Sequence, residues 1–375
     1  MRSFHRGPSR PHALVLALFL ALGCTEASDP VAPPGDVLAS RAPAVDAALA
    51  SPLFALASAP GGTLAVGEAT GIRLLRPHES VAFSSLPNVT GLAPIAASYY
   101  FALTGGRVDP AQLLEGDRKL YRVTRSRARV VANLWEFELN TNPDQIWNTL
   151  PPDSNPFDLV RLDGRVFLVA DAAANDLLRV DESGAVDWVA VLTPRLASTD
   201  NVKRLFGCSA EPLPPPCIGL PEAIPAQPVA TSVAVGPDGA YYVGELTGFP
   251  AEPGIARVWR IEPGSLHVVC PGAGCTLFAD GFTSIMDLEF GPDGTLYVVE
   301  FDGGTWFAVN VMSAGGPLAP VEGGRVKACD AGGVCQLLVD GLDLPTAITI
   351  DRDGRIWIAE NETIPGAGSV RQLLP

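Results

Sequence analysis

The chain has 375 residues and a formal net charge of -15, with 47% hydrophobic and 18% charged residues. This acidity excludes nucleic acid as an expected partner, because phosphates attract basic surfaces. The hydrophobic fraction, together with 38 glycines and 35 prolines, excludes a disordered chain and indicates a well-cored protein with many tight turns.

The N-terminus carries an export signal. Three arginines within the first ten residues precede an apolar run from Ala13 to Leu22, a pattern typical of a signal peptide. The run is too short for a membrane-spanning helix, which needs about 20 apolar residues. It ends in Leu-Ala-Leu-Gly-Cys, which resembles a bacterial lipobox. Residues 1–23 are therefore expected to be a lipoprotein-type signal peptide, with Cys24 lipidated.

The compartment follows from this signal. A lipidated Cys24 would make the mature protein a membrane-anchored lipoprotein of the bacterial envelope, held to the membrane only through that residue. The alternative is ordinary cleavage nearby, which would leave a soluble periplasmic or secreted protein. Residues 24–50 are rich in Ala, Pro, Asp and Ser and are expected to form a flexible tether that ends in at most one strand.

A repeated hairpin dominates the rest of the chain. The sequences TSVAVGPDGAYYVGE, MDLEFGPDGTLYVVE and TAITIDRDGRIWIAE each place two runs of β-branched and aromatic residues around a turn that ends in Asp-Gly, the signature of a β-hairpin. Weaker copies bring the count to six. The copies are Leu53–Glu68, Gly91–Thr104, Phe157–Asp171, Thr231–Glu245, Met286–Glu300 and Thr346–Glu360.

Each hairpin is followed by two further strand-like runs, such as Arg257–Ile261 and Thr276–Ala279. Four antiparallel strands repeated six times predict an all-β fold, a six-bladed β-propeller over residues 51–375. The last copy supplies only three strands and ends at Ser369–Leu374. A segment of residues 36–50 is expected to supply the fourth, with Asp36–Ala39 as the candidate.

Two stretches interrupt the repeat. Asn140–Pro156 links the second and third blades, and Ala197–Gln227 is a proline-rich insertion before the fourth. Loops of this length in a compact domain are usually functional covers or disordered segments.

The cysteines fit an exported protein. Apart from Cys24, six cysteines fall into three close pairs, Cys208–Cys217, Cys270–Cys275 and Cys329–Cys335. In a chain with an export signal this spacing predicts disulfides. Their loops are short, so they are expected to stiffen hairpin tips more than to hold the fold together.

One block of sequence is specific to a family. Val229–Pro250, with the segments that begin at Asn155 and Phe282, resembles the ScyD/ScyE family within the NHL/SMP-30-like propellers. The resemblance implies an exported six-bladed propeller associated with scytonemin-pigment gene clusters, and it implies no settled reaction. The paired cysteines and the lipobox depart from that family's pattern.

Candidate ligand groups come from the first strand of each blade, which lines the central channel of a propeller. The slots at the start of these strands hold Asp158, Asp287, Thr231, Ser232 and Thr346. Two carboxylates, Asp158 and Asp287, with several hydroxyls suit a hard cation such as Ca²⁺. A bound cation could polarise an ester or lactone carbonyl. The alternative is that the two aspartates cap strand ends and bind channel water.

A second acidic set recurs at the end of the second strand, at Glu68, Asp171, Glu245, Glu300 and Glu360. Because it recurs in nearly every blade, the set is interpreted as architectural. Glu245 is the member most suited to a functional role, since it lies in the family block. After the signal peptide only His78 and His267 remain, so neither a Ser-His-Asp relay nor a histidine metal cluster is expected.

The sequence favours a binding or scaffolding propeller at the cell envelope, with an unknown small molecule or an envelope protein as partner and no cofactor that is certain. The alternative from a different class is a Ca²⁺-dependent lactonase- or esterase-like hydrolase with a channel metal site. A third hypothesis, an accessory role in secondary-metabolite (pigment) assembly, rests on the family context alone.

Overall fold

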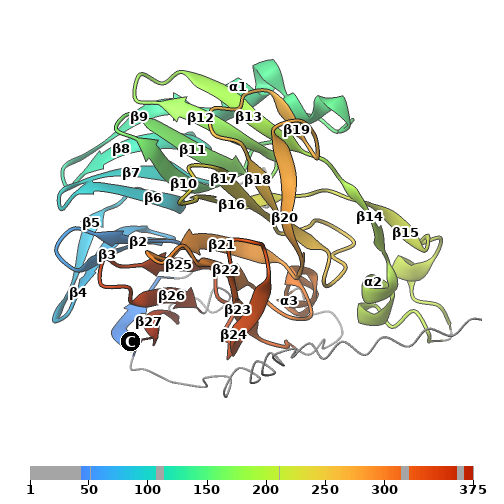
Figure 1. Ribbon diagram of the computed structural model, residues 1–375. Coiled ribbons are helices and arrows are strands. Elements are labelled where there is room, and N and C mark those ends of the chain that lie inside the picture. Colours follow the sequence, from blue (N-terminus) through green and yellow to red (C-terminus); the bar gives the residue numbers. More distant parts are fainter. Residues whose placement is uncertain are drawn as a thin grey trace, which may run out of the picture. The chain divides into compact units, whose positions relative to one another are not determined.

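The computed structural model describes residues 44–50, 52–106, 114–210, 212–313, 321–360 and 367–374, all within one compact unit, Val37–Pro375. These residues form six four-stranded antiparallel blades (Figure 1). The first strand of each blade contacts the first strand of the next, and the sixth contacts the first again. The predicted six-bladed β-propeller is therefore confirmed.

The strands of each blade follow one another from the axis outwards. Those of blades 1 to 3 are β2 (Leu53–Ala59), β3 (Thr63–Glu68), β4 (Gly71–Arg76), β5 (Glu79–Ser84), β6 (Val89–Ala96), β7 (Tyr99–Thr104), β8 (Lys119–Thr124), β9 (Arg127–Asn133), β10 (Pro156–Asp163), β11 (Val166–Asp171), β12 (Asp176–Asp181) and β13 (Val186–Leu192). Those of blades 4 to 6 are β16 (Ala230–Val235), β17 (Tyr241–Glu245), β18 (Ala256–Ile261), β20 (Cys275–Phe282), β21 (Ile285–Phe290), β22 (Leu296–Glu300), β23 (Gly324–Cys329), β24 (Cys335–Leu342), β25 (Ala347–Ile350), β26 (Ile356–Glu360), β27 (Gly368–Leu374) and β1 (Ala44–Leu49).

The hairpins form where the Asp-Gly turns predicted them. Gly239 and Gly294 close the turns of blades 4 and 5 with φ values of 76° and 83°, a left-handed conformation that glycine adopts without a steric penalty. Asp238 accepts the N–H of Ala240 through its side chain at 3.1 Å. Turn chemistry therefore sets the register of the two inner strands.

The ring closes through the N-terminal side of the chain. Strand β1 pairs antiparallel with β27, with Leu49 opposite Gly368, and it completes the sixth blade. Leu49 is fully buried and packs with Leu53 of blade 1 and Val370 of blade 6. The segment named as the candidate, residues 36–39, lies outside the described residues, as does Cys24.

The apolar cores lie between neighbouring blades. One core joins Leu177 of blade 3 to Val243 and Ile261 of blade 4. Another joins Ala359 of blade 6 to Val66 of blade 1. Because each blade buries its faces against its neighbours, much of the hydrophobic stabilisation depends on the complete ring.

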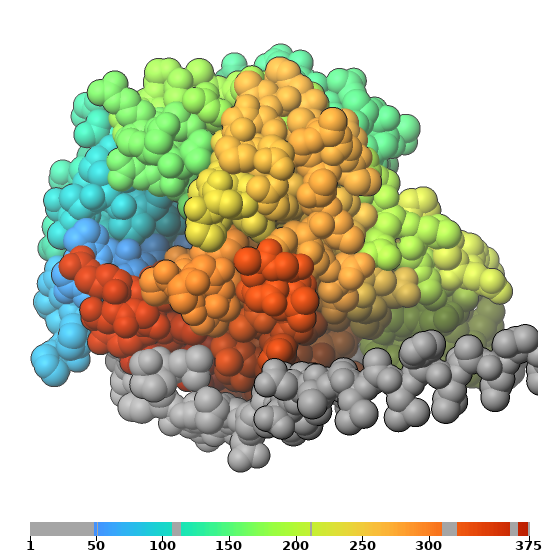
Figure 2. All heavy atoms as spheres, viewed as in Figure 1, coloured from blue at the N-terminus to red at the C-terminus, as the bar shows by residue number. Residues whose placement is uncertain are grey.

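Both interruptions of the repeat contain regular structure. The helix α1 (Leu134–Thr141) runs into the first, which also holds the 3-10 helix η2 (Pro143–Ile146). The second forms the hairpin β14 (Arg195–Ser198) and β15 (Ala223–Ala226), with α2 (Asp200–Leu205) and the 3-10 helix η3 (Pro215–Cys217) between its strands. This insertion protrudes at one side of the ring (Figure 1 and Figure 2). A third helix, α3 (Trp306–Ser313), follows β22.

One strand crosses between blades. Strand β19 (Val268–Cys270) lies between β18 and β20 in the sequence, yet it pairs in parallel with β13, with Ala190 opposite Val268. Blade 3 thus has a fifth strand. This strand comes from the segment between the third and fourth strands of blade 4 and pairs along the outer edge of blade 3.

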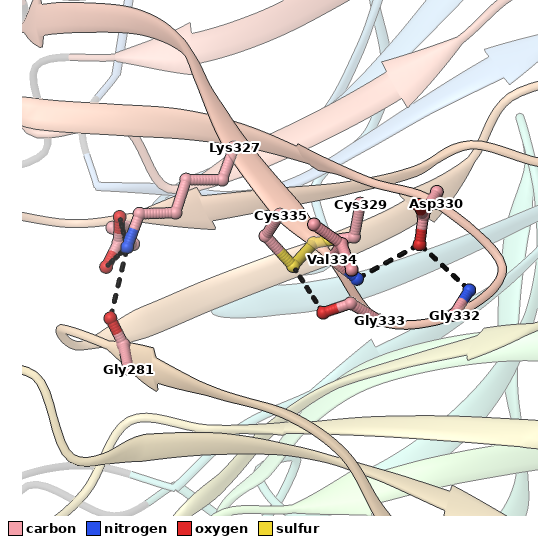
Figure 3. The surroundings of a disulfide bond; sticks show 9 residues. Gly281, Lys327, Cys329, Asp330, Gly332, Gly333, Val334 and Cys335 are labelled. Carbon is pink, nitrogen blue, oxygen red and sulfur yellow. Dashed lines mark hydrogen bonds and ion pairs between the residues drawn. A yellow bond between two sulfur atoms is a disulfide. The ribbon is translucent and has the colours of Figure 1, made fainter. Parts of the chain in front are cut away.

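The three predicted disulfides are formed. Their Cα atoms are 5.6, 5.2 and 3.9 Å apart for Cys208–Cys217, Cys270–Cys275 and Cys329–Cys335. Figure 3 shows the third at the β23–β24 turn, where Asp330 accepts the N–H groups of Gly332 and Val334. Among the described residues, no helix is long and apolar enough to span a membrane.

Candidate functional site

The first strands of the six blades surround a cavity of about 320 Å³ on the axis of the ring. Its walls come from β2, β6, β10, β16, β21 and β25. We call it the axial cavity. Its volume falls at the lower end of the range for small-molecule sites, roughly 300–1,000 Å³.

Apolar side chains from alternate blades meet where the first strands begin. The rings of Phe54 and Phe157 have centroids 5.3 Å apart, although blades 1 and 3 are not neighbours in the ring. Both rings pack in the same cluster as Met286 of blade 5. At the other end the lining includes Ser58 and the exposed Arg161, close to the hairpin turns. Of the two phenylalanines, Phe54 is in the lining of the axial cavity, so the contact between the rings lies near the end where the first strands begin.

The two predicted channel carboxylates line this cavity and also tie blades together. Oδ2 of Asp158 accepts the N–H of Val233 in blade 4 at 2.8 Å. Oδ2 of Asp287 accepts the N–H of Ile348 in blade 6 at 2.8 Å. In each aspartate, Oδ1 accepts the N–H of the following residue. Backbone groups therefore occupy part of the acceptor capacity that a metal would need.

The three predicted hydroxyl groups do not line the axial cavity, which corrects that expectation. Thr231 and Thr346 are 1% exposed and donate to backbone carbonyls of the next blade, those of Ile285 and Leu53. Ser232 is fully buried, and its Oγ has no partner. Thr231 and Thr346 therefore tie their own blades to the next one across the seams between blades.

The threonine ties give a direct prediction. Thr231→Val removes the hydroxyl that bonds the Ile285 carbonyl at 2.6 Å while it keeps the shape of the side chain. We expect the free energy of unfolding to fall by about 1–2 kcal/mol in urea titrations. Thr124→Val is the matched control, since that hydroxyl bonds within an exposed hairpin. Equal losses in the two variants would contradict the assignment.

Glu245 is architectural. It is fully buried, its Oε2 pairs with Nε of Arg257 at 2.8 Å, and its Oε1 accepts from the Trp259 indole. The same pairing with a base on the third strand recurs in blades 1, 5 and 6, as Glu68–Arg73, Glu300–Lys327 and Glu360–Arg371. The functional role considered for Glu245 therefore has no support in its surroundings.

The structure adds one carboxylate that the sequence reasoning missed. Glu289 lies two residues after Asp287 on β21 and lines the axial cavity, because alternate residues of a strand share a face. Burial, followed by the negative charge of Asp158, raises the pKa of Glu289 to about 8. The alternation along β21 from Asp287 could have revealed it.

The axial cavity has more acidic than basic side chains in its lining. Burial raises the pKa of Asp158 to about 6, and burial together with the charge of Asp158 raises the pKa of Asp287 well above its usual value. Arg161 is the single basic residue in the lining, and its guanidinium bonds the carbonyls of Asp163 and Gly164. In the described part of the chain, no three His, Cys, Asp or Glu side chains are arranged to hold a metal ion.

Comparisons with known proteins were made by sequence and by structure. No protein-family model matches the chain, and no curated protein matches it. Solved structures do. A calcium-binding regucalcin from Agrobacterium tumefaciens has a TM-score of 0.53 at 11% identity, over 88% of this chain and 92% of that chain.

Two further structures are similar. A gluconolactonase from Xanthomonas campestris has a TM-score of 0.52 at 13% identity, over 87% of each chain. A putative oxidoreductase (glucose dehydrogenase) from Thermus thermophilus has a TM-score of 0.51 at 18% identity, over 88% of this chain and 99% of that chain. At such identities the likeness shows the fold alone, and the resemblance to the ScyD/ScyE family stays a prediction. What the comparisons show is that this chain shares the propeller fold of these proteins.

Proposed function

We propose that this protein is an exported binding propeller of the cell envelope that takes a small, positively charged ligand into its axial cavity. The observation that carries the proposal is the grouping of Asp158, Asp287 and Glu289 around one cavity whose single base is turned to a hairpin. An ammonium group placed among these carboxylates would favour their ionised forms. No catalytic residue is required for this role.

The shape of the axial cavity supports the same class of ligand. The rest of its lining comes from the inner strands, and Leu56, Leu159 and Val233 among its residues also pack in the cores between blades. A small amine would match a cavity of this volume. The Phe54–Phe157 contact limits the depth of entry, so long polyamines are expected to bind less well than short ones.

Isothermal titration calorimetry with putrescine, and with a neutral diol of the same length, tests this proposal. Putrescine is expected to bind the wild type, and the diol is not. Glu289→Gln is expected to weaken the binding of putrescine by about tenfold or more, since one ion pair is lost from a poorly solvated site.

Glu182→Gln is the matched control, because Glu182 lies in the β12–β13 turn, outside the lining. It should leave the affinity for putrescine unchanged. Equal affinity for the diol and the diamine, or an unchanged affinity in Glu289→Gln, would rule out a cation-binding cavity.

A Ca²⁺-dependent lactonase-like hydrolase is the second candidate. It is favoured by the electrostatic effect of Asp158 on both Asp287 and Glu289, because a divalent cation in the axial cavity would relieve that repulsion. Calcium-dependent hydrolysis of lactone substrates, lost in Asp287→Asn, would establish this function. Binding of putrescine without any hydrolysis would favour the binding role.

A further inference from the structure

A second group of buried carboxylates lies away from the axis, beside blade 3. Glu138 comes from α1 and Asp144 from η2, while Asp171 ends β11 and Asp176 begins β12. Each of the four is at most 2% exposed. Buried charges of one sign are costly unless something compensates them.

The other blades show how this cost is normally met. In blades 1, 5 and 6 the acid at the end of the second strand pairs with a base on the third strand, and that base stands opposite the residue two positions before the acid. The opposed pairs are Val66 with Arg73, Val298 with Lys327, and Ile358 with Arg371. In blade 4 the side chains of Arg257 and Trp259 both donate hydrogen bonds to the buried Glu245.

Blade 3 departs from this arrangement. The residue opposite Val169, two positions before Asp171, is Leu178. The residue directly opposite Asp171 is a second acid, Asp176. The one base of β12, Arg179, is exposed and stands opposite Leu168. Blade 3 therefore has an apolar residue in place of the usual cation, and a second acid opposite the first.

Two residues of this group carry oxygens without a hydrogen-bond partner. Both carboxylate oxygens of Asp176, and Oε2 of Glu138, are buried without a hydrogen-bond partner. Asp171 is different, since it accepts from the Ser154 hydroxyl and from the N–H of Asn155, both at 2.6 Å. The unsatisfied acceptors thus lie on Asp176 and Glu138, and Asp171 adds negative charge beside them.

The side-chain amide of Asn142 lies close to two of the carboxylates. One end of the Asn142 side-chain amide lies 2.8 Å from Oε1 of Glu138 and 3.0 Å from Oδ1 of Asp144. With its nitrogen at that end the amide donates to both carboxylates. With its oxygen there, three oxygens from three side chains converge. A cation between them would select the second orientation.

The electrostatics agree with this geometry. The pKa of Asp176 lies well above its usual value, because burial and then the charges of Asp171, Glu138 and Asp144 disfavour its ionised form. Burial, followed by the charge of Asp171, raises the pKa of Glu138 to about 8. Every charge that contributes to these two shifts is negative.

We propose that Asp176, Glu138 and Asp144, with the side-chain oxygen of Asn142, bind a hard divalent cation of the size of Ca²⁺. Carboxylate and amide oxygens are the ligands that Ca²⁺ takes, in a flexible shell of six to eight. Among the described residues no three acidic side chains already stand in a ligand arrangement. Binding therefore requires these side chains to rearrange around the cation.

Such a cation would join the link between blades 2 and 3 to blade 3 itself. Asn175, at the same turn as Asp176, already donates to Oδ2 of Asp144 at 2.9 Å and accepts the N–H of Val229 at 3.0 Å. The proposed site would strengthen that junction, in the manner of a structural cation. It does not depend on what the axial cavity binds.

Calorimetric titration of the full mature protein with CaCl₂, after treatment with EDTA and dialysis, tests the proposal. We expect one Ca²⁺ per chain and a higher Tm when CaCl₂ is present. Asp176→Asn and Glu138→Gln should each weaken Ca²⁺ binding by about tenfold or more, since affinity follows the charge of the ligand set. Without Ca²⁺, Asp176→Asn should unfold at a higher temperature than the wild type, which shows that the variant folds.

Two control variants separate this site from its rivals. Glu136→Gln changes an exposed glutamate on the same helix, and Glu289→Gln changes the axial cavity; both should bind Ca²⁺ as the wild type does. Loss of Ca²⁺ in Glu289→Gln alone would place the cation in the axial cavity and overturn the proposal. Unchanged affinity in both Asp176→Asn and Glu138→Gln, or no effect of CaCl₂ on the wild type, would also overturn it.

Discussion

A chain that begins at residue 51 is expected to lose cooperative unfolding, whereas one that begins at residue 41 keeps it. The shorter chain lacks β1, so β27 loses its partner strand and the core of Leu53 and Val370 loses the fully buried Leu49. The expected loss is roughly 4 kcal/mol or more, because a buried leucine and a row of strand hydrogen bonds are removed together.

Urea unfolding followed by circular dichroism measures this difference. The two chains differ only by ten residues that include β1, so the longer one controls for removal of everything before residue 41. A sharp transition at the same urea concentration in both chains would show that β1 contributes nothing to the closed ring.

The protein is also expected to be more stable at pH 5.5 than at pH 8 when divalent cations are removed. The pKa values of Glu138 and Glu289 are raised to about 8, and those of Asp158 and Asp171 to about 6, each chiefly by burial. A carboxyl with a raised pKa binds its proton more tightly in the folded state. Its contribution to stability is full below the unfolded pKa near 4 and is lost as the pH rises through the folded value.

Each of the two glutamates is expected to contribute roughly 2–4 kcal/mol to the difference in the free energy of unfolding between pH 5.5 and pH 8, since one unit of pKa shift corresponds to about 1.4 kcal/mol. Carboxyls with lowered pKa values, such as Asp238 and Asp351, lose their contribution only below about pH 4 and do not oppose the trend. Urea titrations at the two pH values in EDTA measure the difference.

The double variant Glu138→Gln with Glu289→Gln should flatten this pH dependence. Stability that rises from pH 5.5 to pH 8 in the wild type would contradict the prediction. CaCl₂ should reduce the difference by raising stability at pH 8, if the site beside blade 3 binds the cation.

The hairpins could be predicted because their determinants are local. Asp238 and Gly239 set a turn within four residues, and the alternating side chains on each side need no distant partner. The same locality explains the disulfides, since Cys329 and Cys335 are only six positions apart. The number of copies of the hairpin then predicted the number of blades.

The orientation of side chains at the strand starts could not be predicted in this way. Each first strand from blade 1 to blade 5 begins with a shift in register, for example between Ala230 and Ser232 and between Ile285 and Asp287. Such bulges change which face a residue joins. Thr231 falls at such a shift and bonds across a seam. Ser232 and Asp287 stand at the same place after the shift, opposite Gly244 and Val299, yet only Asp287 lines the axial cavity. The repeat alone predicts which residues begin each first strand, but not which of their side chains line the axial cavity.

The grouping of carboxylates beside blade 3 could not be predicted from the sequence for another reason. Glu138 and Asp144 lie in a helical link that has no counterpart in the other blades, and Asp176 comes much later, at the start of β12. No spacing motif joins them. The sequence signal that distinguishes this blade is Leu178, an apolar residue at the position where three other blades have Arg or Lys. This signal can be recognised only when the strand register is known.

The pairing of β13 with β19 bears on the order in which the chain can fold. Val191 pairs with Val269, so the outer edge of blade 3 stays uncovered until much of blade 4 has been synthesised. Strands β1 and β27 meet only when almost the entire chain is present. Contacts of such long sequence separation form slowly, and uncovered strand edges attract other chains in the meantime. A chain that is still folding thus passes through a stage with two open edges, at which a chaperone would bind it.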